Sequence, residues 1–123
     1  MSIYIIVLYL LDILMLEIQN LAKQCNESLI LATLITGKKH GYQLALEIEE
    51  KSEGLLKFNH GTLYPILHKL EKEGLIYGSW ERESVKRKRK YYKISAKGKK
   101  YFIEQRGEWI IFYKTFFIII GDG

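Results

Sequence analysis

Side chains with catalytic or metal-binding chemistry are few in this chain of 123 residues. It has three histidines, His40, His60 and His68, and one cysteine, Cys25. The histidines do not have the spacing of a zinc-binding helix, and Cys25 has no base near it in the sequence. No glycine-rich phosphate-binding loop is present either. The sequence therefore predicts no enzyme activity, no metal and no cofactor, and a lone buried thiol that stays reduced in the cytoplasm.

The strongest chemical signal is a basic segment at 82–100. It contains ten Lys or Arg residues and one acid, so it carries +9, whereas the whole chain carries +5. Its centre is an unbroken stretch of cations: Lys86, Arg87, Lys88, Arg89 and Lys90. Crowded like charges are costly without an anion nearby. This pattern favours DNA, RNA or an acidic membrane surface as the partner, and a merely solvated basic face is the alternative.

A second candidate group lies on a helix predicted over 59–74. Its apolar stripe is made by Leu63, Ile66, Leu67 and Leu70, with Asn59 as the N-cap and Gly74 as the terminating glycine. Pro65 requires that the regular helix begin near Tyr64 or that the first turn be distorted. The polar groups beside the stripe are His60, Thr62, Tyr64 and His68. These are the candidates for contact with the major groove of duplex DNA.

The neighbouring segments supply the elements that would position these groups. Apolar periodicity predicts helices over 27–36 (continuing from 20–26) and 42–51, and a helix of about 24 residues from Ala96 with Ser95 as its cap. Two-residue alternation predicts strands over 75–83 and 88–95. Residues 38–41 and 84–87 are predicted turns. Three helices, a hairpin and a long helix make a mainly α (α+β) winged helix-turn-helix with a two-stranded wing. Strand alternation then places only about half of the cations at 86–90 on one face.

The C-terminal helix carries more apolar surface than one small domain can cover. Its stripe runs through Phe102, Gln105, Trp109, Phe112, Phe116 and Ile119, and the last part, WIIFYKTFFIII, is apolar almost all round. An exposed patch of this size favours burial against a second subunit. We therefore predict a homodimer formed through residues 96–120. A membrane-seated tail and a disordered tail are the alternatives.

The N-terminal segment is also apolar, but its unbroken run covers only residues 3–11 before Asp12. A spanning helix needs roughly 18–20 apolar residues, and no basic region or cleavage site typical of a signal peptide is present. We expect no stable membrane insertion and a cytoplasmic protein. Residues 1–17 are interpreted as an N-terminal extension. It is either an extra helix packed on the domain or, with translation starting at Met15, a segment outside the natural protein.

Three segments together resemble the PadR family of bacterial transcriptional regulators. HGYQLALEIEEKS at 40–52 is similar to the second helix of that family, and GTLYPILHKLEKEGLI at 61–76 to its recognition helix. RKRKYYKISAKGKK at 87–100 is similar to its wing strand. The resemblance runs in register from Leu29 to Trp109. The short tail looks like the compact subgroup, which has one C-terminal dimerisation helix.

The resemblance implies a dimeric repressor that binds a double-stranded DNA operator and leaves it when an effector binds. By position, Tyr42, Thr62 and Tyr64 would contact DNA, and Arg87 to Lys90 would form the wing contact. Trp109, with Phe112 near it, would stack on a planar aromatic or cationic effector, as in multidrug-sensing relatives. A dimer-core tryptophan without a ligand is the alternative. The wing tip SVKR lacks the glycine pair of many relatives, and the tail is more apolar than the family pattern.

These observations divide the chain into the extension at 1–17, a winged-helix DNA-binding domain at 18–95 and a dimerisation helix at 96–120. The leading hypothesis is a sequence-specific DNA-binding transcriptional regulator. A membrane-associated protein that uses both apolar ends and the basic segment is one alternative. A winged-helix module for RNA or protein, without operator specificity, is the other, because fold alone does not determine function.

Overall fold

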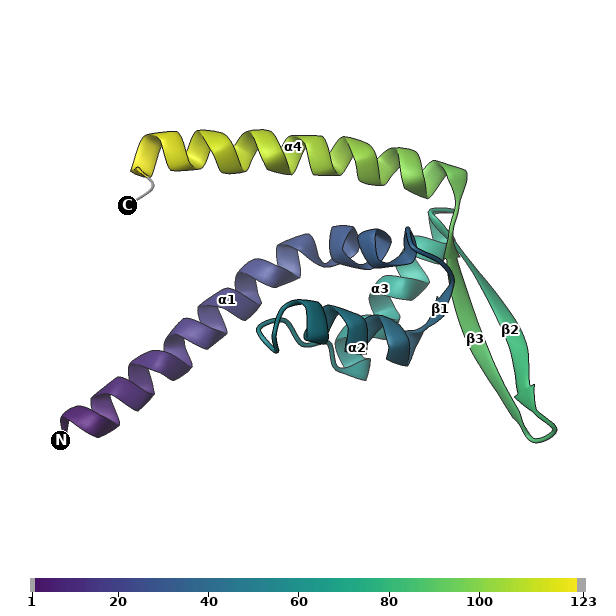
Figure 1. Cartoon of the computed structure of the whole chain (residues 1–123), viewed down its shortest axis with the longest axis horizontal. Coiled ribbons are helices and arrows are strands. Elements are labelled where there is room, and N and C mark those ends of the chain that lie inside the picture. The colour runs from purple at the N-terminus through teal and green to yellow at the C-terminus, as the bar shows by residue number, and fades with distance from the viewer. Residues whose placement is uncertain (1, 122–123) are drawn as a thin grey trace.

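The computed structural model describes the backbone of residues 2–121 and the side chains of residues 2–16 and 25–121. Along the chain the elements are α1 (Ile3–Leu34), β1 (Lys39–His40), α2 (Gly41–Lys51), α3 (His60–Lys72), β2 (Ile76–Ser84), β3 (Arg87–Ile94) and α4 (Ala96–Ile120). The strands form an antiparallel sheet in the order β1-β3-β2. The long hairpin of β2 and β3 projects from the helices as a wing (Figure 1). This arrangement confirms the mainly α (α+β) winged helix-turn-helix fold.

The hydrophobic core lies where the base of the wing meets the first three helices. Its buried side chains are Ile30, Leu31 and Leu34 of α1, Leu44 and Ile48 of α2, Leu63, Leu67 and Leu70 of α3, and Leu75, Ile76, Tyr92 and Ile94 at the base of the wing. Tyr92 is buried while its neighbour Tyr91 is not. Successive side chains of a strand point to opposite faces, which confirms that one of these two tyrosines packs on the core.

The predicted helix caps are confirmed. The Asn59 side chain accepts a hydrogen bond from the Thr62 amide at 2.9 Å, and Gly74 has the left-handed φ of 76° expected at a helix end. One alternative raised by Pro65 is wrong, because α3 begins at His60 and not near Tyr64. The Asn59 cap stabilises the first turn of α3. Pro65 lacks an amide donor, but it lies near the start of the helix, and α3 continues through it.

The predicted turn at 38–41 contains a short strand instead. Lys39 and His40 pair with Tyr92 and Tyr91 of β3, because the extended backbone before α2 runs along the free edge of the wing base. A strand of two residues has too little alternation to be recognised in the sequence. This pairing joins the start of α2 directly to the wing.

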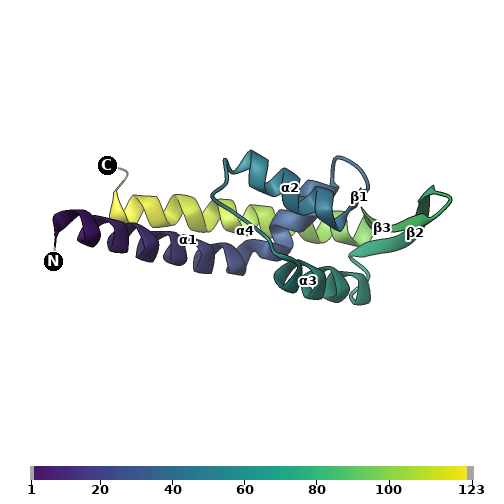
Figure 2. The ribbon, with the colours of Figure 1, turned by 90° about the horizontal axis from the view of Figure 1, so that it is seen from below.

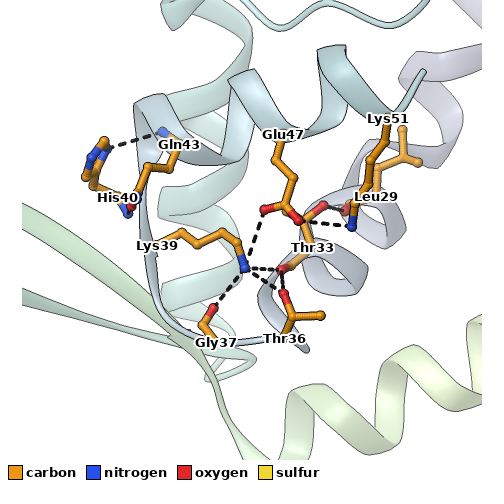
Figure 3. A network of polar contacts seen from close by, with 9 residues as sticks. All are labelled: Leu29, Thr33, Thr36, Gly37, Lys39, His40, Gln43, Glu47 and Lys51. Carbon is orange, nitrogen blue, oxygen red and sulfur yellow. Dashed lines mark hydrogen bonds and ion pairs between the residues drawn. The ribbon is translucent and has the colours of Figure 1, made fainter. Parts of the chain in front are cut away.

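Lys39 also holds the end of α1 against α2 (Figure 3). Its ammonium group donates hydrogen bonds to three oxygens at the end of α1: the Thr33 carbonyl at 2.8 Å, Thr36 Oγ1 at 2.7 Å and the Gly37 carbonyl at 3.3 Å. It lies 3.5 Å from the Glu47 carboxylate of α2. Lys39 therefore gives the Thr33 carbonyl, one of the last in α1, a partner from outside the helix, and it links α1 to α2.

The two ends of the chain extend away from this core. α1 is one continuous helix from Ile3, and it contacts α4 near the core before the two helices diverge toward the chain ends, opposite the wing (Figures 1 and 2). The apolar side chains of 3–16 are exposed, as are most of those of 110–120. Where side chains are described, which leaves out 17–24, no helix has the length and hydropathy to cross a membrane.

Two glycines of α4 provide a test of how this helix is seated. A Cβ added at Gly98 would clash with the Leu75 carbonyl oxygen, whereas one added at Gly107 would meet no described atom from elsewhere in the chain within 4 Å. Gly98→Ala should therefore lower the free energy of unfolding by about 1–3 kcal/mol through overpacking. Gly107→Ala should raise it by about 0.5–1 kcal/mol through helix propensity.

Both variants are compared with the wild type by urea unfolding at one protein concentration, since association would make stability depend on concentration. A Gly98→Ala protein as stable as the wild type would contradict the close approach of α4 to Leu75.

Candidate nucleic-acid interface

A hollow of about 650 Å³ opens between the wing and the amino-terminal ends of α2 and α3. It is lined by His40, Gly41, Tyr42, His60, Tyr64, Trp80, Arg87, Lys88, Arg89, Lys90 and Tyr92. The fold thus brings Tyr42, His60 and Tyr64 together with Arg87 to Lys90 from a separate part of the chain. Cations and aromatic rings facing one cavity can hold an anionic polymer that also presents flat or apolar surfaces.

Three residues predicted from the sequence lie outside this hollow. Thr62 is half-buried, and its amide is engaged by the Asn59 cap. His68 is exposed further along α3, and Lys86 is exposed at the tip of the wing. Helix geometry explains the difference along α3. His60 and Tyr64 are four residues apart and share a face, whereas Thr62 points about 200° away from His60.

The helical side of the hollow is formed by stacked rings. The His60 and Tyr64 rings lie 5.6 Å apart with an interplanar angle of 10°. The Tyr64 ring rests against the start of α2, because a Cβ added at Gly41 would lie 2.9 Å from the Tyr64 hydroxyl oxygen. Tyr42 and Tyr64 keep exposed edges. Gly41 therefore allows the tyrosine of one helix to sit at the amino terminus of the other, where free backbone amides favour a phosphate.

The cations of the wing differ in how far they are already neutralised. Arg89 Nε lies 3.1 Å from the Glu83 carboxylate, and Arg87 Nε lies 4.0 Å from it. Lys90 donates a 2.8 Å hydrogen bond to Glu71 of α3, which raises the pKa of Lys90. Lys86 and Lys88 have no acidic partner among the described side chains. These five cations are indistinguishable in the sequence, and the structure shows that they are not equivalent.

The Lys90–Glu71 pair also joins the wing to α3. It crosses the backbone of β2 at Gly78, where an added Cβ would clash with Lys90 Cε. Lys90 Nζ further lies 5.5 Å from the centre of the Tyr92 ring. These contacts set the distance between the two sides of the hollow.

His40 connects the start of α2 to the wing on the other side of the sheet. Its Nδ1 accepts a hydrogen bond from the Gln43 amide at 3.2 Å, and its Nε2 lies 2.7 Å from a guanidinium nitrogen of Arg89. A neutral imidazole has one acceptor nitrogen, so these two donors compete for it, and a protonated ring can accept from neither. Burial, and then the positive charge of Arg89, lowers the pKa of His40. In the sequence His40 belongs to a predicted turn, and nothing in its spacing indicates this role.

His40 should make stability depend on pH. Because its pKa is lower in the folded than in the unfolded state, the unfolded chain binds more protons near pH 6, so the contribution of the neutral ring is complete above the unfolded pKa and is lost as pH falls through the folded pKa. His40→Asn keeps a cap acceptor without a titrating ring. The free energy of unfolding, measured from pH 7.5 to 5, should fall less steeply in this variant than in the wild type.

The control for this experiment is His68→Asn, at an exposed position on α3. It should leave the slope of the wild type unchanged. An equal reduction of the slope in both variants would show that His40 has no particular part in the pH dependence.

The remaining candidate residues lie away from the hollow. Trp109 is half-buried on α4, and its ring meets that of Phe112 edge to face with 6.0 Å between the centroids. Cys25 is half-buried rather than buried as expected, and its burial raises the pKa of the thiol. Among the side chains that the structure describes, no three His, Cys, Asp or Glu residues gather as a metal site would require.

Comparison with known proteins identifies relatives of this chain. The model of the transcriptional regulator PadR-like family matches residues 30–104. A transcriptional regulator from Clostridium thermocellum is 30% identical, with a TM-score of 0.73 over 79% of this chain and 91% of that one. A PadR family transcriptional regulator from Eggerthella lenta has a TM-score of 0.82 over 94% of this chain and 99% of that one; at 22% identity it shows a shared fold.

A third structure contains DNA. Bacillus subtilis PadR, solved in complex with operator DNA, is 27% identical, with a TM-score of 0.59 over 69% of this chain and 46% of that one. The family match includes the last turn of α1, both helices of the helix-turn-helix, the whole wing and the start of α4. Because the family model matches more than half of the chain, including every element that lines the hollow, this chain belongs to the PadR-like family of transcriptional regulators.

Proposed function

We propose that this protein is a sequence-specific regulator that binds double-stranded DNA in the cytoplasm as a dimeric repressor and is released by a small-molecule effector. The observation that carries this proposal is the hollow between α3 and the wing, lined by cations and rings. Residues 18–95 act as the DNA-binding domain and residues 96–120 as the dimerisation helix, with 1–17 as an extension of α1.

The arrangement of α3 and the wing suits duplex DNA. A recognition helix enters the major groove with its amino-terminal residues against the base edges, and His60 and Tyr64 lie on the exposed side of that part of α3. We propose His68, one turn beyond Tyr64, and Thr62, on another side of the first turn, as further contacts outside the hollow. Tyr42 and the cations from Lys86 to Lys90 then reach the flanking phosphates. The complex of Bacillus subtilis PadR with operator DNA supports duplex DNA as the partner.

The dimer proposal rests on the apolar surface of α4. The predicted stripe is half-buried at Phe102, Gln105 and Trp109, but Phe112, Phe116 and Ile119 are exposed in the single chain. A second copy that covered this part of α4 would remove a large apolar patch from water. A two-fold axis through the helices would also give two recognition helices for two half-sites of DNA.

The effector proposal concerns the same helix. Trp109 and Phe112 form an edge-to-face pair that continues into a stack of Phe112 on Phe116, whose centroids are 6.1 Å apart. Two copies of this aromatic ladder facing one another would offer flat apolar surfaces to a planar aromatic or cationic molecule. Binding there would change the spacing of the two DNA-binding domains and so release the operator.

DNA binding is tested by fluorescence anisotropy with a duplex from the upstream region of the protein's own gene and with a scrambled duplex, over a range of salt concentrations. We expect a preference of about 10³ or more for the native duplex and a steep salt dependence. Tyr64→Phe removes one hydroxyl from the hollow and should weaken binding about tenfold if that group meets a phosphate. Tyr77→Phe, on the side of the wing base, should bind as the wild type does.

Equal affinity for both duplexes would contradict operator specificity at this site, and stronger binding to structured RNA would favour an RNA-binding module. Retention on vesicles of anionic lipid without DNA binding would favour the membrane-associated alternative.

The dimer is tested by sedimentation equilibrium, which should give twice the chain mass of 14.5 kDa. Phe112→Glu introduces a charge at a position that is 61% exposed in the single chain, so it should leave the folded protomer intact but shift the mass toward the monomer. Val85→Glu makes the same kind of change at the wing tip, where Val85 is 88% exposed, and should leave the mass unchanged. A dimer that persists in Phe112→Glu would exclude this part of α4 from the interface.

A further inference from the structure

The wing has two chemically different faces. The register pairs Trp80 with Lys90 and Arg82 with Lys88, and strand alternation places all four side chains on one side of the ribbon. We call these four residues the Trp80 face. Tyr92 continues this face into the core, and Lys90 reaches Glu71 of α3, so the Trp80 face is turned toward the recognition helix.

On the opposite face both acids of the wing are paired with cations. Glu83 accepts a 2.7 Å hydrogen bond from the Tyr91 hydroxyl and pairs with Arg89. Glu81 pairs with Lys38 at 2.6 Å. A shift in register between Arg82 and Ser84 gives Glu83 its own position in the strand, outside the regular pairing. The acids of the wing therefore form their ion pairs and hydrogen bonds on the side away from α3.

The Trp80 face carries an uncompensated repulsion. Arg82 and Lys88 lie directly opposite each other across the two strands, and neither has an acidic partner among the side chains described. Like charges directly opposite in an antiparallel pair destabilise it. An anion between or beside these two groups would turn this repulsion into attraction. Arg82 is not among the candidates taken from the sequence, because its partner in the register cannot be read from spacing.

Trp80 adds a large apolar group to the same face. Its side chain is 68% exposed although it lines the hollow, and no ring contact to it is found among the described residues. An indole held in water beside cations is costly unless a partner covers it. The opposite side of the hollow carries the stacked rings of His60 and Tyr64. Rings and cations therefore line one cavity, and Arg82 lies next to it, opposite Lys88.

We infer that the Trp80 face holds one sugar–phosphate strand of DNA, with the Trp80 indole against a deoxyribose and Arg82 and Lys88 against phosphates. This inference rests on the proposed DNA-binding function. A helix that lies in the major groove has the bordering strand at its side, and that is where the hollow lies. The strand presents apolar sugar faces between anionic phosphates, which suits a surface that combines rings and cations. This contact sets affinity and does not read sequence.

The first test compares two exposed aromatic residues of β2. Trp80→Ala should weaken binding about tenfold for native and scrambled duplexes alike, with an unchanged salt slope, because an apolar contact releases no counterions. Tyr77→Ala is the control, since Tyr77 is 62% exposed on the opposite face, and it should bind as the wild type does. Trp80→Phe should recover most of the affinity. Urea unfolding of each variant shows that the fold is kept.

The second test concerns the cations. The double variant Arg82→Ala/Lys88→Ala should lower the salt slope by about 2, one for each phosphate that the variant no longer neutralises. Lys99→Ala/Lys100→Ala removes the same charge from exposed positions on α4 and should change the slope by much less.

A direct readout comes from Trp109→Phe, which leaves Trp80 as the single tryptophan of the chain. Its emission should change when either duplex is added. Three results would overturn the inference while leaving the proposed function intact: Trp80→Ala binding like Tyr77→Ala, a weakening confined to the native duplex, or no emission change on binding. A wild-type protein that binds no duplex at all would instead overturn the proposed function.

Discussion

The burial of Tyr92 in the core determines to which face the side chains of β3 point. Tyr92 and Ile94 pack with Leu75 and Ile76 at the base of the hairpin, where the wing meets the three helices. Because side chains alternate along a strand, this burial places Lys88 and Lys90 on the face of β3 that is turned to α3 and Arg87 and Arg89 on the opposite face, although all four residues line the hollow. A shift by one residue would exchange the two sets and would also expose Tyr92. The hydrophobic core therefore sets the electrostatics of a surface that lies well outside it.

Ion pairs then hold the wing in place relative to the helices. Lys90 reaches Glu71 on α3, and Arg89 lies between His40 at the start of α2 and Glu83 in the wing itself. These pairs are at least partly exposed, and such pairs contribute little to overall stability. Their consequence is geometric, since they fix the width of the hollow and occupy the acids on the face away from α3. On the face turned to α3, Arg82 and Lys88 have no acidic partner among the described side chains, which is why we propose them as phosphate contacts.

The same division between a polar and an apolar end extends over the whole molecule. The wing and the amino-terminal ends of α2 and α3 form one end, and the exposed apolar stretches of α1 and α4 form the other (Figure 1). α1 is one helix from Ile3, so the apolar extension continues directly into the helix that supplies Ile30, Leu31 and Leu34 to the core.

The sequence by itself determined the local elements and the residue types of the interface. Helical spacing of Leu63, Leu67 and Leu70, the Asn59 cap, and the alternation around Tyr92 are local properties, so they could be read along the chain. The family motifs likewise lie in short segments. For the same reason Tyr64 and Arg87 to Lys90 could be selected as candidates, although their common hollow could not be seen.

Only the tertiary structure decided the rest. The strand at Lys39 and His40, the pairing of Arg82 with Lys88 and the exposure of Trp80 depend on register between strands distant in sequence. The neutralisation of Arg89 by Glu83 and of Lys90 by Glu71 depends on which elements pack together. Thr62 and His68 could be selected as polar groups beside the apolar stripe. That they lie outside the hollow could not be foreseen, because helical spacing does not tell which part of a helix faces the wing. A pattern within one segment records its own periodicity, whereas contacts between segments arise only when the core brings them together.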